Sequence, residues 1–402
     1  MRKISKILMM VIALAAITFT ATGAQAYKVN DNNEIYGYST VWAILDENSF
    51  AAKNSTQTGT GDAGKDKSFG FEAKQLRLGA RGNMADGFLG YNLLFDGAGS
   101  ITSNSATQIV EGWMTVRPIG QTLDINIGQF RPYGNYEVGI ESAGKIENLD
   151  VYKAGSLQTA SYLVLANNTR DRGVEFVVNK IADIAQLRIS ATNGIGNNGD
   201  VGGSASGSTR GILSNGMGDA AYNAALIVTP FEGLRLNAGY GMNKHENAVT
   251  SPAVTSTCTV GSDGKTVTCT AGSSSAVADI DRTVFAAGGK LSLGDLGLWL
   301  DAEYSALKAA DKDTLKPGYE VNGYYARIGF YVIPKALDVY ARYQAWNETA
   351  KTGATQMKHS GYDVNVRYKV DNFIFTAEYE KLDLDGTSDD PVRVALRTVL
   401  FY

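Results

Sequence analysis

Arginine is the residue type whose spacing in this chain could do chemistry, because it recurs at alternate positions of segments with strand-like patterns. Arg77 and Arg81, four residues apart, would point to the same face of a strand. A low-dielectric wall lined by guanidinium groups focuses its electric field and attracts anions. The candidates for anion contact are Arg77, Arg81, Arg131, Arg170, Arg172, Arg188, Arg235, Arg367 and Arg397.

The same arginines also have a purely structural interpretation. Acidic residues such as Asp96, Asp338 and Asp363 stand at alternate positions of neighbouring segments. Opposite charges that face each other across strands stabilise a sheet without selecting any ion. Both interpretations stay open at the level of the sequence.

A second charged set is acidic and lies in the longest stretch without sustained periodicity, residues 132–168. Pro132 and Gly134 end the preceding strand pattern, because proline donates no ladder hydrogen bond and glycine permits a sharp turn. A loop of this length inside an ordered protein is usually functional. We expect it to fold into a pore and to narrow it. Its acids would face the wall arginines and set a transverse field: Glu137, Glu141, Glu147 and Asp150.

Enzyme chemistry is not expected from the histidines, of which there are only two, His245 and His359. Ser360 follows His359 directly, so the two side chains would point to opposite faces of a strand. A nucleophile and its base must lie within hydrogen-bond reach of each other. The sequence therefore predicts no catalytic residue.

Cys258 and Cys269 are the two cysteines, and both lie in a loop rich in serine, threonine and glycine, residues 245–280. In an exported, oxidising setting two nearby thiols form a disulfide that staples such a loop. A metal site would need more ligands than this stretch offers. We expect a disulfide, no metal and no cofactor.

Strict alternation of apolar and polar residues sets the expected elements. Tyr362 and Val364 would share one face of a strand, and Asp363 and Asn365 the other. Sixteen segments of this kind are expected, at 34–45, 72–83, 88–96, 107–118, 121–131, 169–180, 183–193, 219–230, 233–244, 281–293, 295–307, 319–333, 336–346, 359–370, 372–382 and 391–402.

Short and long connections alternate between these segments, as tight turns and external loops do in outer-membrane barrels. The sequence therefore predicts an all-β fold, a 16-stranded antiparallel transmembrane β-barrel with an inward-folded third external loop. The barrel would occupy residues 27–402 as a single domain, with 132–168 as the constriction loop and 245–280 as a long external loop.

The first 26 residues are typical of a secretory signal peptide. Arg2, Lys3 and Lys6 precede an apolar stretch, and small residues lead to a cleavage site after Ala26. The apolar stretch is shorter than the roughly 20 residues that a membrane-spanning helix needs. Without the signal peptide, 34 basic residues remain against 41 acidic ones, which argues against nucleic acid as a partner.

Four short motifs together resemble the phosphate-selective porin O and P family. They are Gln75-Leu76-Arg77-Leu78-Gly79-Ala80-Arg81-Gly82, Gly128-Gln129-Phe130-Arg131-Pro132-Tyr133-Gly134, Arg170-Asp171-Arg172-Gly173-Val174 and Ala191-Thr192-Asn193-Gly194. The match covers roughly the first half of the mature chain. The resemblance implies a homotrimeric, 16-stranded Gram-negative porin whose third external loop folds inward.

We therefore expect an outer-membrane porin for passive diffusion of small hydrophilic solutes and ions, with a mild preference for anions of the phosphate type. Its partners would be the lipid bilayer, lipopolysaccharide and the permeating small anions or polar solutes. The terminal aromatic residue, Tyr402, resembles the signal that the barrel-assembly machinery reads. The alternative is a structural or adhesive outer-membrane surface protein without an open pore, which the Ser/Thr/Gly-rich loops at 194–218 and 245–280 would suit.

Overall fold

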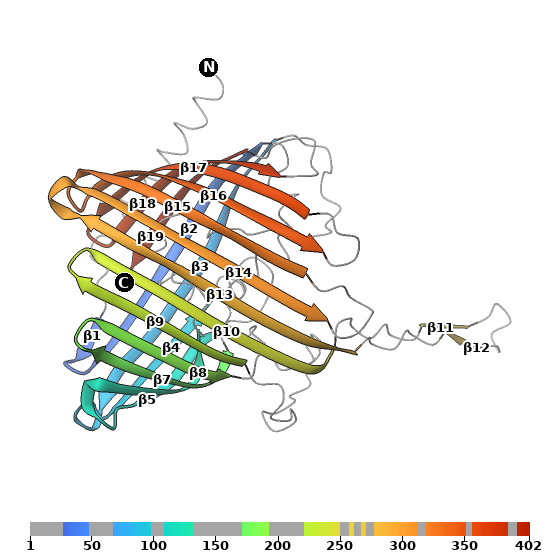
Figure 1. Ribbon diagram of the computed structural model, residues 1–402, viewed down its shortest axis with the longest axis horizontal. Coiled ribbons are helices and arrows are strands. Elements are labelled where there is room, and N and C mark those ends of the chain that lie inside the picture. Colours follow the sequence, from blue (N-terminus) through green and yellow to red (C-terminus); the bar gives the residue numbers. More distant parts are fainter. Residues whose placement is uncertain are drawn as a thin grey trace, which may run out of the picture.

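The computed structural model describes residues 27–47, 67–97, 108–131, 171–192, 221–249, 257–260, 267–270, 277–311, 319–350, 356–384 and 392–402 (Figure 1). The expected signal peptide and the expected constriction loop, residues 132–168, lie outside these ranges. The inward fold of that loop therefore stays a prediction.

The described strands form a closed antiparallel barrel. Sixteen strands follow one another around the ring in chain order, and the last pairs with the first, Phe401 opposite Tyr38. The strands of the ring are β2 (Asn33–Glu47), β3 (Lys67–Met84), β4 (Leu89–Asp96), β5 (Gln108–Val116), β6 (Leu123–Phe130), β7 (Asp171–Ile181), β8 (Ala185–Thr192), β9 (Ala221–Phe231), β10 (Leu234–Val249), β13 (Val277–Leu293), β14 (Leu298–Asp311), β15 (Tyr319–Ile333), β16 (Leu337–Ala350), β17 (Gln356–Val370), β18 (Phe373–Leu384) and β19 (Val392–Phe401). The predicted strand count is confirmed.

Three short strands were not expected from the sequence. β1 (Tyr27–Asn30) pairs with the start of β2. β11 (Thr257–Val260) and β12 (Val267–Thr270) form a separate ribbon, in which Cys258 lies opposite Cys269. Directly opposed positions of an antiparallel pair lie at the Cα separation that a disulfide requires. The disulfide itself stays a prediction.

The short connections gather at one end of the barrel, which we call the turn end (left in Figure 1). Single 3-10 turns lie there, η1 (Ala85–Gly87), η2 (Gly120–Thr122) and η4 (Gly294–Leu296). Two of its aspartates, Asp86 and Asp371, have left-handed backbone angles (φ 52° and 47°), which aspartate tolerates better than most residues. No helix in the described part of the chain has the length and apolar character needed to cross a membrane.

The two faces of the wall are inverted relative to those of a soluble protein. On β17, Tyr362 and Val364 are each 45% exposed on the outer face, whereas Asp363 and Asn365 are 0% exposed on the inner face. β18 and β19 continue the same alternation, with Glu380 and other polar side chains inward. The predicted alternation is confirmed, and it is the pattern of a barrel whose outside meets lipid.

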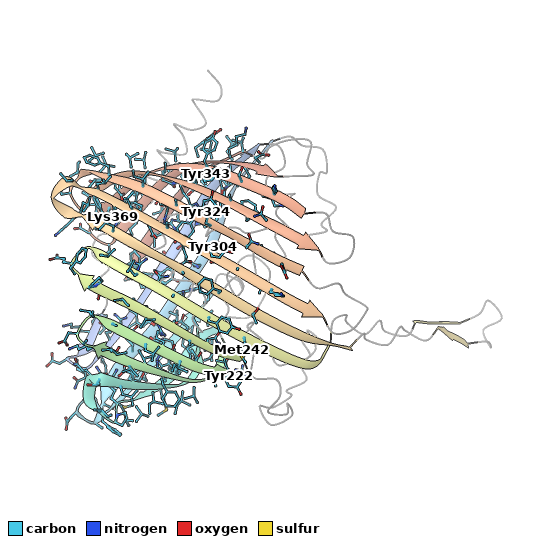
Figure 2. The ribbon with its side chains drawn as sticks, in the orientation of Figure 1. Tyr222, Met242, Tyr304, Tyr324, Tyr343 and Lys369 are labelled. Carbon is cyan, nitrogen blue, oxygen red and sulfur yellow. The ribbon has the colours of Figure 1, made fainter. Side chains whose placement is uncertain are left out.

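A row of tyrosines crosses the outer face of one side of the barrel. Tyr304, Tyr324 and Tyr343 come from the neighbouring strands β14, β15 and β16 (Figure 2). Tyr324 and Tyr343 have ring centroids 6.2 Å apart, and the series continues through Tyr362 to Tyr379, whose centroids are 6.3 Å apart. We call these five residues the tyrosine row. Such rings suit the boundary between lipid chains and headgroups.

The last residue of the chain lies across the seam that closes the barrel. The backbone N–H of Tyr402 donates to the carbonyl oxygen of Gly37 in β2, with N and O 3.0 Å apart. The carbonyl oxygen of Tyr402 accepts from the N–H of the same Gly37. Its hydroxyl reaches past β2 and donates to the carbonyl oxygen of Arg77 in β3, at 2.9 Å. The ring fits because Gly37 has no side chain: a Cβ there would come within 2.5 Å of Tyr402 Cε2.

Tyr402→Phe should therefore weaken the seam. It removes one hydrogen bond and leaves the ring in place, so we expect the free energy of unfolding to fall by about 1 kcal/mol. Urea unfolding of the folded barrel in detergent measures this. Tyr304→Phe is the matched control, because Tyr304 is also an outward tyrosine but no hydrogen bond from its hydroxyl is seen among the described residues. Equal effects of the two substitutions would contradict the role of the Tyr402 hydroxyl.

Candidate functional site: the inner wall of the barrel

The inner wall is lined with ion pairs that join neighbouring strands. Arg327 of β15 and Asp301 of β14 face each other in the register, and Nη2 lies 2.7 Å from Oδ2. Both side chains are almost completely buried, at 2% and 3% exposure. The guanidinium also lies over the ring of Tyr325, 4.9 Å from its centroid. A buried charge is tolerated only when it is paired and hydrogen-bonded in this way.

A chain of five charges continues across β16 to β19. Arg342 Nε lies 2.6 Å from Asp363 Oδ2, and Arg342 Nη2 lies 3.8 Å from Glu380 Oε1. Arg393 Nη2 then bridges Glu380, at 2.5 Å, and Glu378, at 3.4 Å.

One more pair belongs to the same side of the wall. Both Nε and Nη2 of Arg367 donate to the carboxylate of Asp338, a two-pronged contact that fixes the guanidinium in one plane. We call the charges of this side the paired-charge sector: Asp301, Arg327, Asp338, Arg342, Asp363, Arg367, Glu378, Glu380 and Arg393.

The wall from β3 to β8 carries pairs of the same kind, but one member of each is more exposed: Asp96 at 15% and Arg188 at 20%. Arg77 is fully buried, with Nε 2.8 Å from Asp96 Oδ2 and Nη1 2.6 Å from the hydroxyl of Tyr38. Arg188 donates twice to Glu175, at 2.9 Å each.

The structure distinguishes the arginines predicted to contact anions. Arg77, Arg367 and Arg397 are on the inner wall but at most 3% exposed. The side chain of Arg131 is 17% exposed and paired with Glu111. Their burial and pairing favour the interpretation that most of these arginines stabilise the sheet and do not contact anions.

Two arginines remain open to solvent. The side chain of Arg81 is 57% exposed and pairs with Glu34 near the turn end. Arg172 is also exposed, but it shares the outward parity of Phe176, and its Nε contacts Gln129, so it does not face the pore. Arg170 and the loop acids Glu137, Glu141, Glu147 and Asp150 lie outside the described residues.

A polar hollow opens at the turn end, lined by the ends of β3 to β10. It has a volume of about 1070 Å³. Arg235, one of the predicted anion contacts, lines it together with Arg117 and Lys180. Asn179 and Gln186 line it too, and sequence reasoning missed them because amides carry no charge signal.

The side chain of His245 lies outside the described residues, so only that of His359 can be placed. His359 stacks on Trp346 inside the wall, with ring centroids 5.2 Å apart. Ser360 has the opposite parity on β17, as predicted. Within the described ranges, no three His, Cys, Asp or Glu side chains are grouped closely enough to hold a metal ion.

The fold is shared with solved outer-membrane channels. The outer-membrane channel DcaP of Acinetobacter baumannii aligns with a TM-score of 0.59 at 16% identity, over 94% of this chain and 100% of that one. An anion-selective porin from Comamonas acidovorans aligns with a TM-score of 0.59 at 12% identity, over 92% and 99% of the two chains.

A third structure, the trimer form of OmpT from Vibrio cholerae, aligns with a TM-score of 0.56 at 14% identity, over 92% and 100% of the chains. A scan against protein-family models and a search of curated protein sequences find no match. At these identities the likenesses show the barrel fold.

Arg327→Leu should lower the free energy of unfolding by about 3–5 kcal/mol, because it leaves the Asp301 carboxylate buried without its partner. The double variant Arg327→Leu/Asp301→Leu should recover most of that loss, since no isolated charge remains. Urea unfolding in detergent compares the two.

Arg81→Leu is the control for this experiment. Its ion pair with Glu34 is exposed, so we expect a loss of no more than about 1 kcal/mol. Similar losses for Arg327→Leu and for the double variant would show that the charge pair itself does not govern the stability of this wall.

Proposed function

We propose that the protein is an outer-membrane porin through which small hydrophilic solutes and ions diffuse passively. The observation that carries this proposal is the closed 16-stranded barrel with an apolar outer face and a charged inner face. In lipid, only a helix or a closed barrel satisfies every backbone polar group, and a polar interior is what a water-filled passage requires. The short connections of the turn end then face the periplasm.

The proposed selectivity is weak, with a mild preference for anions. Most wall arginines already pair with a carboxylate, so the net field across the pore is small. Arg81 also pairs with a carboxylate, that of Glu34, but its side chain is far more exposed to the lumen than those of the other wall arginines. Membership of the phosphate-selective porin O and P family, and a transverse field from the acids of the loop at 132–168, remain proposals that rest on the sequence resemblance.

Planar-bilayer recording of the purified protein tests the function. Stepwise conductance under a KCl gradient supports a porin. Correctly folded protein that gives no conductance would favour the alternative, a structural or adhesive surface protein. The observation that supports this alternative is the near-complete burial of the paired-charge sector.

Arg81→Glu should move the reversal potential toward cation selectivity, because it reverses an exposed charge beside the periplasmic mouth. Arg172→Glu is the control, since that side chain shares the outward parity of its strand and should leave the potential unchanged. Arg77 is unsuitable for this test, because it is fully buried and reversal of its charge would destabilise the fold. An unchanged potential in Arg81→Glu would remove this residue from the permeation path.

We also propose that the barrel assembles as a homotrimer through the outer face of β19, β2, β3 and β4. The tyrosine row does not extend there, and this face instead presents aliphatic residues such as Leu76, Leu78 and Leu93. The trimer form of the Vibrio cholerae OmpT structure, which shares the barrel fold, supports a trimeric assembly. The rest of the outer surface would contact the lipid bilayer and lipopolysaccharide, and Tyr402 the barrel-assembly machinery.

Leu78→Arg should dissociate the trimer, because a charge in that interface has no partner. Leu300→Arg is the matched control: Leu300 is also outward, at 40% exposure compared with 52% for Leu78, but it lies on β14 beside the tyrosine row. Light scattering in detergent measures the mass of each variant. Loss of the trimer in both variants, or in neither, would contradict the proposed interface.

A further inference from the structure

The polar hollow at the turn end has balanced charge. Three basic side chains, Arg117, Lys180 and Arg235, and three acidic ones, Asp86, Asp124 and Asp183, line it. Four carboxamides line it as well: Asn83, Gln121, Asn179 and Gln186. A lining that is rich in hydrogen-bonding groups without an excess of either charge suits an uncharged polar ligand.

Arg117 is held rigidly at the wall of this hollow. Its Nε lies 3.2 Å from Asp124 Oδ1, and its Nη1 lies 2.8 Å from Asn83 Oδ1 and 3.0 Å from the carbonyl oxygen of Gly87. The guanidinium lies against Gly90, where a Cβ would come within 3.1 Å of both terminal nitrogens. These contacts leave Nη2 without a hydrogen bond to any described residue, as a fixed donor.

Asn179 and Gln186 form a second fixed group. Gln186 Nε2 donates to Asn179 Oδ1 at 2.7 Å, from the neighbouring strands β8 and β7. This bond leaves Gln186 Oε1 as an acceptor and Asn179 Nδ2 as a donor, and each amide holds the other in place. A hydroxyl group both donates and accepts, so this pair matches it. Phe88 adds an apolar ring to the same lining, on which the C–H face of a sugar ring can pack.

We propose that this hollow is a binding subsite for neutral polyhydroxylated solutes of the sugar and polyol class. Asn179, Gln186 and Arg117 supply the hydrogen bonds, and the balanced charges exclude a strong preference for ions. The proposal deepens the proposed porin function, because the subsite lies at the periplasmic mouth of the proposed passage. No covalent step is involved.

Binding of glucose to the purified, detergent-solubilised protein tests the subsite without requiring conduction. Saturation-transfer NMR should show a saturable signal from glucose with the native protein. Asn179→Leu/Gln186→Leu should weaken binding by about ten- to a hundredfold, since it removes two hydrogen bonds, each of which contributes about a factor of three to ten. Gln75→Leu is the matched control, because Gln75 is an amide on β3 outside this hollow, near Thr40.

The outcomes separate this subsite from the porin function. A glucose signal that is lost in the double variant and kept in Gln75→Leu supports the subsite. This holds even if bilayers show no conductance, a result that would contradict only the porin proposal. Absence of a signal with native protein, or a signal that is undiminished in the double variant, overturns the subsite even if the protein conducts. Gluconate that competes better than glucose would also overturn it, because a neutral ligand class predicts that an added negative charge gains nothing.

Discussion

Closure of the backbone hydrogen-bond ladder is the constraint on which the rest of this structure depends. In hydrocarbon an unpaired N–H or C=O group costs several kcal/mol, so a sheet there can have no free edge. The pairing of β19 with β2 removes both edges at once. Tyr402 extends this seam to a third strand, since its hydroxyl bonds to the Arg77 carbonyl across Gly37. The last residue of the chain thus contributes to the contact that makes the barrel continuous.

Closure with an apolar outside forces the polar side chains inward, where many of them become buried. A buried guanidinium needs a carboxylate close by, and the antiparallel register supplies one on the next strand, as it does for Arg327 and Asp301. Each pair joins two strands and also cancels most of the field of its own arginine. The stability of the wall and the weak ion selectivity that we propose would therefore come from the same contacts.

The fold was predictable from the sequence because a barrel wall with one lipid face imposes a period of two over every strand. Tyr362 to Asn365 carry that period in their residue types alone. β1 was missed because Tyr27–Asn30 is too short to show it. The ion pairs were harder to predict. Which acid lies opposite Arg342 depends on the register between β16 and β17, and the pattern of a single strand does not encode that register. The outward parity of Arg172 was also missed, since the motif that contains it suggested a pore contact.

The hollow at the turn end shows why the interior of this barrel cannot be understood from its charges alone. A guanidinium that already faces a carboxylate adds little net potential, but it remains a directional donor wherever one of its nitrogens is unused. Arg117 is such a group, fixed by Asp124, Asn83 and Gly87. The uncharged amides of Asn179 and Gln186 add directional hydrogen-bonding groups without adding net charge. If the proposed subsite binds solutes, a wall of paired charges would discriminate between them by the geometry of hydrogen bonds more than by the sign of their charge.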